Sequence, residues 1–193
     1  MALTATVYCA SSRKVDQKYF DATIQLADTL LERNVRVIYG GGAVGLMGTL
    51  ADRYLEKQGM ITGVIPEFMV KVEWAHPKVQ DMHIVHDMHE RKKKLIEGTD
   101  AVIALPGGTG TLEELAEVIT LKRLGKFTKP IFLMNTDGFY DPLNAFLLKM
   151  ADENFLSHEH LSMWRLFNHP ADFWSSYESF PPWHEDKINL AQV

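Results

Sequence analysis

Short runs of apolar residues alternate along the chain with longer segments in which apolar residues recur every three or four positions. The short runs are typical of strands that are buried on both faces, and the longer segments are typical of amphipathic helices. In residues 16–33, for example, Phe20, Ile24 and Ala27 fall on one helical face. Asp16 precedes this segment and is placed to cap the helix.

The predicted elements follow an almost regular alternation of strand and helix. We expect strands at 3–10, 35–39, 60–65, 82–86, 100–105 and 130–135, and helices at 16–33, 45–57, 88–98, 110–124 and 141–153. Residues 67–81 show no clear period and are expected to form a long loop. The alternation predicts an α/β fold with a Rossmann-like, doubly wound, mainly parallel sheet and helices on both faces.

Length and composition favour a single nucleotide-binding domain over residues 1–193. A chain of 193 residues suits one sizeable core. A hydrophobic content of 46% with 23% charged residues is ordinary for a globular protein. From about residue 157 the chain is rich in Trp, Phe, Pro and His. We expect this extension to form a C-terminal helix and a segment packed on the domain or on a partner.

The net charge of −5 argues against nucleic acid as the main partner, because binding the phosphate backbone requires a basic surface. A small anionic ligand is compatible with this charge, since a local pocket can oppose the global sign. We expect no membrane partner, because no apolar stretch reaches the roughly 20 residues of a span. The start lacks a signal-peptide pattern, and the single Cys9 cannot form an intramolecular disulfide, so a cytoplasmic location is expected.

Two glycine-rich turns follow predicted strands and precede predicted helices. The first contains Gly40, Gly41 and Gly42, and the second is Pro106-Gly107-Gly108-Thr109-Gly110-Thr111. Backbone N–H groups at such helix N-termini can surround a phosphate. The second turn is neither a Walker A loop nor a GxGxxG fingerprint, which disfavours kinase and dinucleotide-binding functions. It therefore predicts a phosphate site of another kind.

Glu114 has two interpretations. Together with Thr111 it matches a capping box, in which the glutamate only closes the helix N-terminus. Alternatively, it is a carboxylate placed beside the phosphate turn. Glu113 and Glu117 fall on the polar face of the same helix, where we expect them to be solvated.

Four adjacent cations lie in the predicted helix 88–98. Helical spacing places Lys92 in the middle of the apolar face and Arg91 on its edge, whereas Lys93 and Lys94 point away. A lysine that points inward is unfavourable unless it meets an anion. Arg91 and Lys92 are therefore candidates for contact with a phosphate or a carboxylate.

The remaining candidates for site chemistry favour ordinary roles. His83, His86 and His89 cross a predicted strand–helix junction, where their rings would not converge on a metal ion. Cys9 lies in an apolar strand and is expected to be a buried small residue rather than a nucleophile. We expect neither a metal nor another cofactor.

The motifs together resemble the Lonely Guy (LOG) family, and the resemblance runs from about residue 5 to 155. It rests on Gly40-Gly41-Gly42 with Gly45-Leu46-Met47-Gly48, on Met88-x-x-Arg91-Lys92, and on Pro106-Gly107-Gly108-x-Gly110-Thr111-x-x-Glu114. Cys9-Ala10-Ser11-Ser12 is similar to the family's Cys-Gly-Ser-Ser, with alanine in place of one glycine.

This resemblance implies an enzyme that hydrolyses the N-glycosidic bond of cytokinin riboside 5′-monophosphates or AMP and releases the free base and ribose 5-phosphate. It implies a homodimer with active sites near the interface, and catalysis by Arg91 and Glu114. The loop that contains Glu73 departs from the plant pattern. The substrate contacts that the resemblance implies are Ser11, Gly41, Gly42, Glu73, Met88, Lys92, Gly107, Gly108, Thr109, Gly110, Thr111, Glu113 and Thr120.

Two other functions are compatible with the sequence. One is a protein that binds or senses a nucleotide without cleaving it, and the other is a different hydrolase or transferase that acts on a phosphosugar. The presence of Glu114 together with Arg91 and Lys92 favours hydrolysis, because simple binding does not require a carboxylate beside an anion site.

Overall fold

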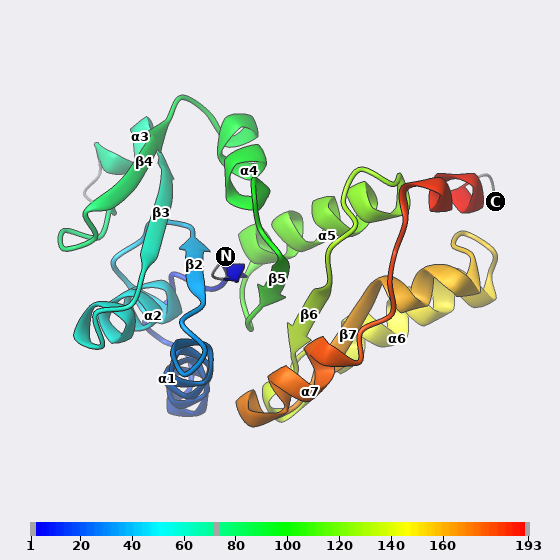
Figure 1. The fold of residues 1–193 in the computed structure, drawn as a ribbon, viewed down its shortest axis with the longest axis horizontal. Helices are drawn as coiled ribbons and strands as arrows, with labels where there is room; N and C mark the ends of the chain where they lie inside the picture. The colour runs from blue at the N-terminus through cyan, green and yellow to red at the C-terminus, as the bar shows by residue number, and fades with distance from the viewer. Residues whose placement is uncertain (1–2, 72–73, 192–193) are drawn as a thin grey trace.

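The computed structural model describes residues 3–71 and 74–191. Within these residues seven strands form one sheet in the order β4-β3-β2-β1-β5-β6-β7, and each neighbouring pair is parallel (Figure 1). The α/β fold predicted from the alternation is therefore confirmed. The strands are β1 (Thr4–Tyr8), β2 (Arg36–Tyr39), β3 (Ile61–Pro66), β4 (Asp81–Val85), β5 (Ala101–Ala104), β6 (Ile131–Met134) and β7 (Trp164–Phe167).

Helices connect the strands, and Asp16 caps the first of them by accepting a hydrogen bond from the Lys18 N–H group at 3.1 Å. The α-helices are α1 (Gln17–Leu31), α2 (Gly45–Glu56), α3 (Glu67–Val70), α4 (Met88–Ile96), α5 (Thr109–Arg123), α6 (Asp141–Asp152) and α7 (Phe173–Glu178). Short 3-10 helices are η1 (Thr136–Gly138), η2 (His158–Met163), η3 (Pro170–Asp172) and η4 (Glu185–Ala191).

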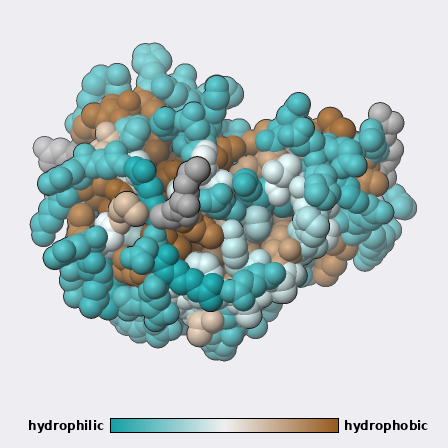
Figure 2. All heavy atoms as spheres, in the orientation of Figure 1, coloured by the Kyte–Doolittle hydropathy of each residue, from teal (hydrophilic) through white to brown (hydrophobic). Residues whose placement is uncertain are grey.

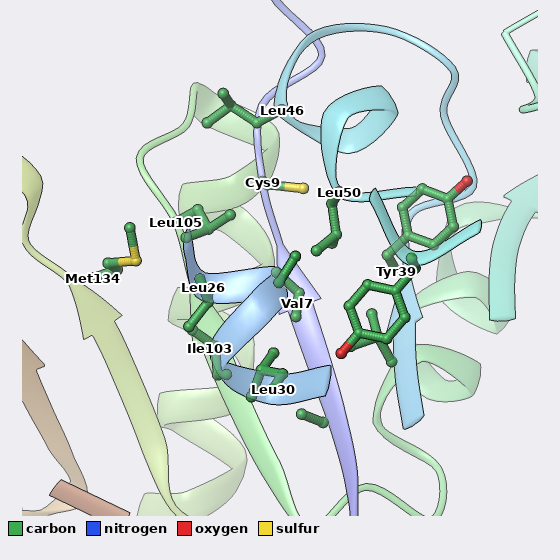
Figure 3. Close-up of a cluster of buried hydrophobic side chains, with 14 of the residues drawn as sticks. Val7, Cys9, Leu26, Leu30, Tyr39, Leu46, Leu50, Ile103, Leu105 and Met134 are labelled. Carbon is green, nitrogen blue, oxygen red and sulfur yellow. The ribbon is translucent and has the colours of Figure 1, made fainter. Parts of the chain in front are cut away.

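The sheet is covered on both faces, as a doubly wound fold requires. Side chains of successive strand residues alternate between the two faces. On β5, Ile103 packs into a core formed with α1, α2 and α7, whereas Val102 packs into a second core formed with α4, α5 and α6. Figure 3 shows part of the first core, where Leu26 of α1 and Leu50 of α2 lie close to Val7 of β1. Burial on both faces explains the continuous apolar runs.

Two predictions about irregular regions were wrong in part. The expected loop 67–81 contains the one-turn helix α3. The aromatic-rich extension contributes a seventh strand, β7, which pairs with β6 from Trp164 to Phe167. This strand has only four residues and includes Arg165, so its pattern is too short to predict a strand. The extension does pack against the sheet, since the rings of Phe173 and Phe132 lie 5.3 Å apart.

The strand order reverses its direction of growth at β1, which lies between β2 and β5. In open α/β sheets, ligands bind at the carboxyl ends of strands on either side of such a switch point. The first glycine-rich turn follows β2, and the second follows β5. The fold therefore brings both turns to the edge of the sheet where a ligand is expected.

Among the described residues, no helix combines the length and the apolar character needed to cross a membrane.

Candidate active site at the switch point of the sheet

A cavity of about 560 Å³ lies at the carboxyl ends of β1, β2 and β5. A larger hollow of about 640 Å³ lies between the ends of α1 and α2, and two of its charged lining residues, Arg53 and Asp28, pair with each other. The cavity at the switch point combines buried charge with open helix ends, so it is the stronger candidate site. Its predicted lining residues are Ser11, Gly42, Met88, Arg91, Gly108, Thr109, Gly110, Thr111 and Glu114.

The second glycine-rich turn is held in place by the strand that precedes it. The Leu105 N–H group donates to the Tyr8 carbonyl at 2.8 Å, and the Tyr140 hydroxyl donates to the Leu105 carbonyl at 2.7 Å. Helix α5 then begins at Thr109, directly after Gly108, which has no side chain that could cap it. The first-turn N–H groups of α5 therefore face the cavity with their partial positive charge, which suits an anionic ligand.

The first glycine-rich turn brings the start of α2 against the loop after β1. Gly45 has a φ of +63°, and a Cβ atom there would come within 2.5 Å of the Ser11 backbone. Only glycine combines this conformation with so close an approach. The Met47 N–H group donates to the Ala10 carbonyl at 3.2 Å. The start of α2 and the backbone of Ser11 and Ser12 therefore lie together, and both serines line the cavity.

A buried ion pair joins α4 to α5 across the cavity. Arg91 Nη1 donates to Glu114 Oε1 at 2.8 Å, and each side chain is only 9% exposed. Arg91 Nε donates to the Val64 carbonyl at 3.2 Å, and Nη2 donates to the Gly40 carbonyl at 3.3 Å. These contacts hold the guanidinium at the ends of β2 and β3. The Glu114 carboxylate is thereby kept in one position on the cavity wall.

The environment of Glu114 favours its neutral form more than water would. Burial is the largest cause and raises the pKa of this carboxyl, the Arg91 charge opposes the change, and the nearby Glu113 charge adds to it. The net result is a pKa above the ordinary glutamate value. A carboxylate with a raised pKa is a better proton acceptor near neutral pH, which is the property expected of a catalytic base.

The predicted capping box is not formed. Gly108 occupies the N-cap position, so Thr111 lies inside the first turn of α5 rather than ahead of it. The paired glycines allow the helix to begin earlier than the Thr111–Glu114 spacing suggested. Glu114 turns toward Arg91 instead of closing the helix end. This contact removes the helix-capping interpretation of Glu114 that the sequence left open.

The predicted orientations of Arg91 and Lys92 were also wrong. Arg91 is buried and shares the inner face of α4 with Leu95, one turn later. Lys92 lies at the rim, where its ammonium contacts Glu113 at 2.6 Å and Glu117 at 3.2 Å. We predicted that both glutamates would be solvated on the polar face of the helix, but each of them contacts Lys92. Helix α4 has only nine residues, and its few apolar positions do not define the buried face well enough to show which of two adjacent cations points inward.

The remaining predicted substrate contacts among the described residues do not line the cavity. Gly41 lies behind it, against Ile65, and Gly107 packs against the Thr111 side chain. The Thr120 hydroxyl donates to the Ala116 carbonyl on the outer side of α5. Lys92 and Glu113 pair at the rim. Glu73 lies outside the described residues. The roles implied for these residues stay predictions.

The cavity also has lining residues that the motifs did not single out. Tyr8 and Cys9 come from the end of β1, and burial raises the pKa of the Tyr8 hydroxyl and of the Cys9 thiol. Both groups are therefore protonated near neutral pH, and Cys9 is buried as expected. Their position at the end of a strand beside the switch point is the sequence feature that could have predicted their place in the cavity wall. The other additional lining residues are Val7, Ala10, Ser12, Gly40, Val44, Met47, Ile65, Met69 and Trp74.

No group of three or more His, Cys, Asp or Glu side chains suited to a metal ion occurs in residues 3–71 and 74–191. Of the three histidines considered for such a site, His83 contacts Asp81 on its own strand, with His83 Nε2 and Asp81 Oδ1 3.3 Å apart.

Solved structures with the same fold include two proteins named for the molybdenum cofactor. The molybdenum cofactor binding protein from Rippkaea orientalis aligns with a TM-score of 0.70 and 19% identity over 93% of this chain and 97% of its own. The molybdenum cofactor carrier protein from Chlamydomonas reinhardtii aligns with a TM-score of 0.70 and 14% identity over 93% and 98%. At these identities the likeness establishes the fold alone.

Sequence comparisons identify the family. The family model described as "Possible lysine decarboxylase" matches residues 47–177. The cytokinin riboside 5′-monophosphate phosphoribohydrolase LOG2 of Arabidopsis thaliana is 45% identical over 78% of this chain and 71% of its own length. The probable cytokinin riboside 5′-monophosphate phosphoribohydrolase LOGL2 of Oryza sativa subsp. japonica is 39% identical over 95% of this chain and 75% of its own length. The chain therefore belongs to the LOG family, the LOG type of the proteins grouped as possible lysine decarboxylases.

Proposed function

We propose that this protein is a phosphoribohydrolase that cleaves the N-glycosidic bond of cytokinin riboside 5′-monophosphates and of AMP. The products are the free base and ribose 5-phosphate. The observation that carries the proposal is the buried Arg91–Glu114 pair on the wall of a cavity that also receives the open end of α5. Relatives that are 39–45% identical over 78–95% of this chain have names that state this activity for cytokinin riboside 5′-monophosphates.

The open end of α5 is the proposed phosphate site. The N–H groups of Thr109, Gly110 and Thr111 belong to a first turn without a side-chain cap, and these residues line the cavity. A phosphate bound there is held by several donors and by the helix dipole. Binding energy from the phosphate, which does not react, then positions the glycosidic bond for cleavage.

Glu114 is the proposed catalytic carboxylate. As the bond between the base nitrogen and C1′ breaks, positive charge develops on the ribose ring, and a nearby carboxylate stabilises it. Water supplies a hydroxyl group to C1′, and its proton passes to Glu114, whose raised pKa suits this task. The departing base takes up a proton in turn. Arg91 keeps the carboxylate in place and limits the rise of its pKa.

The positions of the lysines support the hydrolase over a decarboxylase. A pyridoxal-phosphate enzyme needs a lysine amine at the cofactor. Among the described residues that line the cavity there is no lysine. The fully buried Lys122 lies near the opposite end of α5 and donates to the carbonyls of Thr128 and Lys129.

The direct test is to incubate the protein with AMP and with isopentenyladenosine monophosphate and to measure the released base. We expect release from at least one of them in the absence of added metal. Glu114→Gln should retain binding and lose about a hundredfold or more of turnover, since it removes the charge at the reacting centre. A protein that binds these monophosphates without releasing base would be a nucleotide-binding or sensing protein, and the proposal would be wrong.

We also propose that the protein forms a homodimer through α6. Only Ala151 of this helix is buried, while Phe146 on the helix and Phe155 just after it are exposed. An exposed apolar surface of this kind is typical of association sites. Sedimentation should give twice the 21.9 kDa mass of the chain, and Phe146→Asp should give the monomer mass.

The cytoplasmic location expected from the sequence stays a prediction.

A further inference from the structure

The loop that follows β1 presents two adjacent cations beside the cavity. Ser11 and Ser12 line the cavity, and Arg13 and Lys14 come next in the chain. The Lys14 N–H group donates to Ser12 Oγ at 3.2 Å, which turns the chain directly after the lining serines. Both cations are exposed. Their Cα atoms lie within about 8 Å of the Ser12 Cα atom, because consecutive Cα atoms are about 3.8 Å apart.

Both ends of this loop are held by the fold. At its start, the Met47 N–H group donates to the Ala10 carbonyl at 3.2 Å. At its end, Val15 packs against the core formed with α1 and α2, and Asp16 caps α1. The two cations lie between these anchored positions, so the fold keeps them close to the edge of the cavity.

Arg13 and Lys14 make no ion pair with the residues that the structure describes. Figure 2 shows hydrophilic residues, in teal, over much of the visible surface, so exposure alone does not distinguish these two cations. Their lack of a carboxylate partner does. Lys18, at the start of α1, is different because it pairs with Asp137. Two adjacent cations without partners produce a local positive potential that an approaching anion meets.

The cavity wall offers an approaching anion no net positive charge. Among the lining residues that the structure describes, only Arg91 and Glu114 are charged, and they pair with each other. At the rim, Lys92 is shared by Glu113 and Glu117, which leaves this side with a surplus of negative charge. The whole chain has a net charge of −5. An anion that approaches the cavity is therefore repelled by the chain as a whole and by the rim beside α5.

We propose that Arg13 and Lys14 form a cationic arm that steers phosphate monoesters into the cavity and sets how fast the enzyme captures its substrate at low salt. This inference rests on the proposed function and adds two residues that act before the phosphate reaches the start of α5. A phosphate monoester carries a charge of about −1.5 to −2 at pH 7. Two cations within a Debye length of about 8–10 Å of the cavity edge attract such an anion at physiological salt. The cationic arm takes no part in bond cleavage.

The first experiment follows kcat/KM for AMP against the concentration of sodium chloride. The double variant Arg13→Gln, Lys14→Gln should lose about tenfold of kcat/KM at about 10 mM salt, where the Debye length is about 30 Å. At about 1 M salt, where this length is about 3 Å, the loss should be less than about twofold. Its kcat should be unchanged, because the cationic arm acts before cleavage. Arg13→Lys should keep the wild-type salt profile, since it retains the charge.

The double variant Lys57→Gln, Lys126→Gln is the matched control. Both lysines are exposed, and the control changes the net charge by the same amount as the variant of the cationic arm. Lys57 follows the end of α2, Lys126 follows the end of α5, and both helices begin at the cavity. At 1.5 Å per residue, these helices place both lysines about 18 Å or more from it. The control should lose no more than about twofold of kcat/KM at low salt.

The second experiment measures binding without turnover, by calorimetry in a Glu114→Gln background. AMP and ribose 5-phosphate should bind the Arg13→Gln, Lys14→Gln variant about tenfold more weakly at about 10 mM salt and almost equally at about 1 M. Adenosine, which has no phosphate, should bind with and without the cationic arm alike at both salt concentrations. This measurement needs no cleavage, so it tests the cationic arm even if no base is released.

The outcomes separate the two proposals. If the wild type releases base and the Arg13→Gln, Lys14→Gln variant keeps the wild-type kcat/KM at every salt concentration, the cationic arm is wrong and the proposed function stands. If no base is released but the variant binds AMP more weakly only at low salt, the cationic arm stands and the hydrolase is wrong. A loss of kcat, a loss that persists at high salt, or an equal loss in the lysine control would overturn the cationic arm.

Discussion

The buried charged groups at the two ends of α5 have different partners. At its start, Glu114 and Arg91 form an ion pair on the wall of a cavity. Near its end, Lys122 is fully buried and pairs with no carboxylate of residues 3–71 and 74–191. Its ammonium donates to the Lys129 carbonyl at 2.5 Å and lies 5.0 Å from the centre of the Phe180 ring. The Trp183 indole covers this end and donates to the Lys122 carbonyl at 2.9 Å. Figure 1 shows the C-terminal segment, in red, beside the end of α5.

This difference separates a site from a structural contact. The N-cap residue of α5, Gly108, makes no side-chain hydrogen bond to the first-turn N–H groups, so a ligand can satisfy them. The groups at its end are satisfied by the chain itself, with carbonyls around the Lys122 ammonium and an indole N–H on the helix. We therefore expect substitutions at the start to change catalysis and substitutions at the end to change stability.

Arg91→Ala should have the largest effect. Glu114 would be left buried without a partner, its pKa would rise further, and its position would be lost. We expect kcat/KM to fall about a hundredfold, as for a catalytic group that is misplaced by about 1 Å. Because activity requires the ionised carboxylate, the acid limb of the pH profile should move to higher pH. A pH profile that keeps the wild-type acid limb would contradict this role for the pair.

Trp183→Ala should weaken the other end of α5. Truncating a buried tryptophan costs about 3–5 kcal/mol, and Trp183 is only 6% exposed. Urea unfolding should report this loss, while kcat/KM at temperatures below unfolding should change by less than about twofold, since the cavity lies at the start of the helix. Equal stability with lost activity would show that the two ends are not separable in this way.

Lys122→Met should have a smaller effect that depends on pH. Burial lowers the pKa of Lys122 to about 7, so between pH 7 and its unfolded value the unfolded chain binds more protons than the folded one. This group therefore makes the free energy of unfolding rise with pH, by up to about 1.4 kcal/mol per pH unit. The variant lacks that contribution. Unfolding at pH 7 and pH 9 should show a smaller increase than in the wild type, and equal increases would refute the assignment.

Local sequence patterns predicted most of the fold because they depend on neighbours in the chain. Six of the seven strands and the helices between them follow from apolar period, caps and glycine breaks, as Asp16 at the start of α1 illustrates. Strand β7 was not predicted, because its pairing with β6 joins residues about thirty positions apart and its four residues show little alternation of apolar and polar positions. The start of α5 was placed within one residue.

The sequence by itself determined the order of the first six strands and the longer helices, the two glycine-rich turns and the family, because each depends on spacing along the chain. Only the tertiary structure decided which side chains meet. Arg91 rather than Lys92 enters the cavity, and Glu114 pairs with it instead of capping α5, because the ends of β2 and β3 offer the guanidinium two carbonyls. Contacts between α4 and α5 span 23 positions and depend on how both helices pack on the sheet. Periodicity within one helix carries no information about that packing.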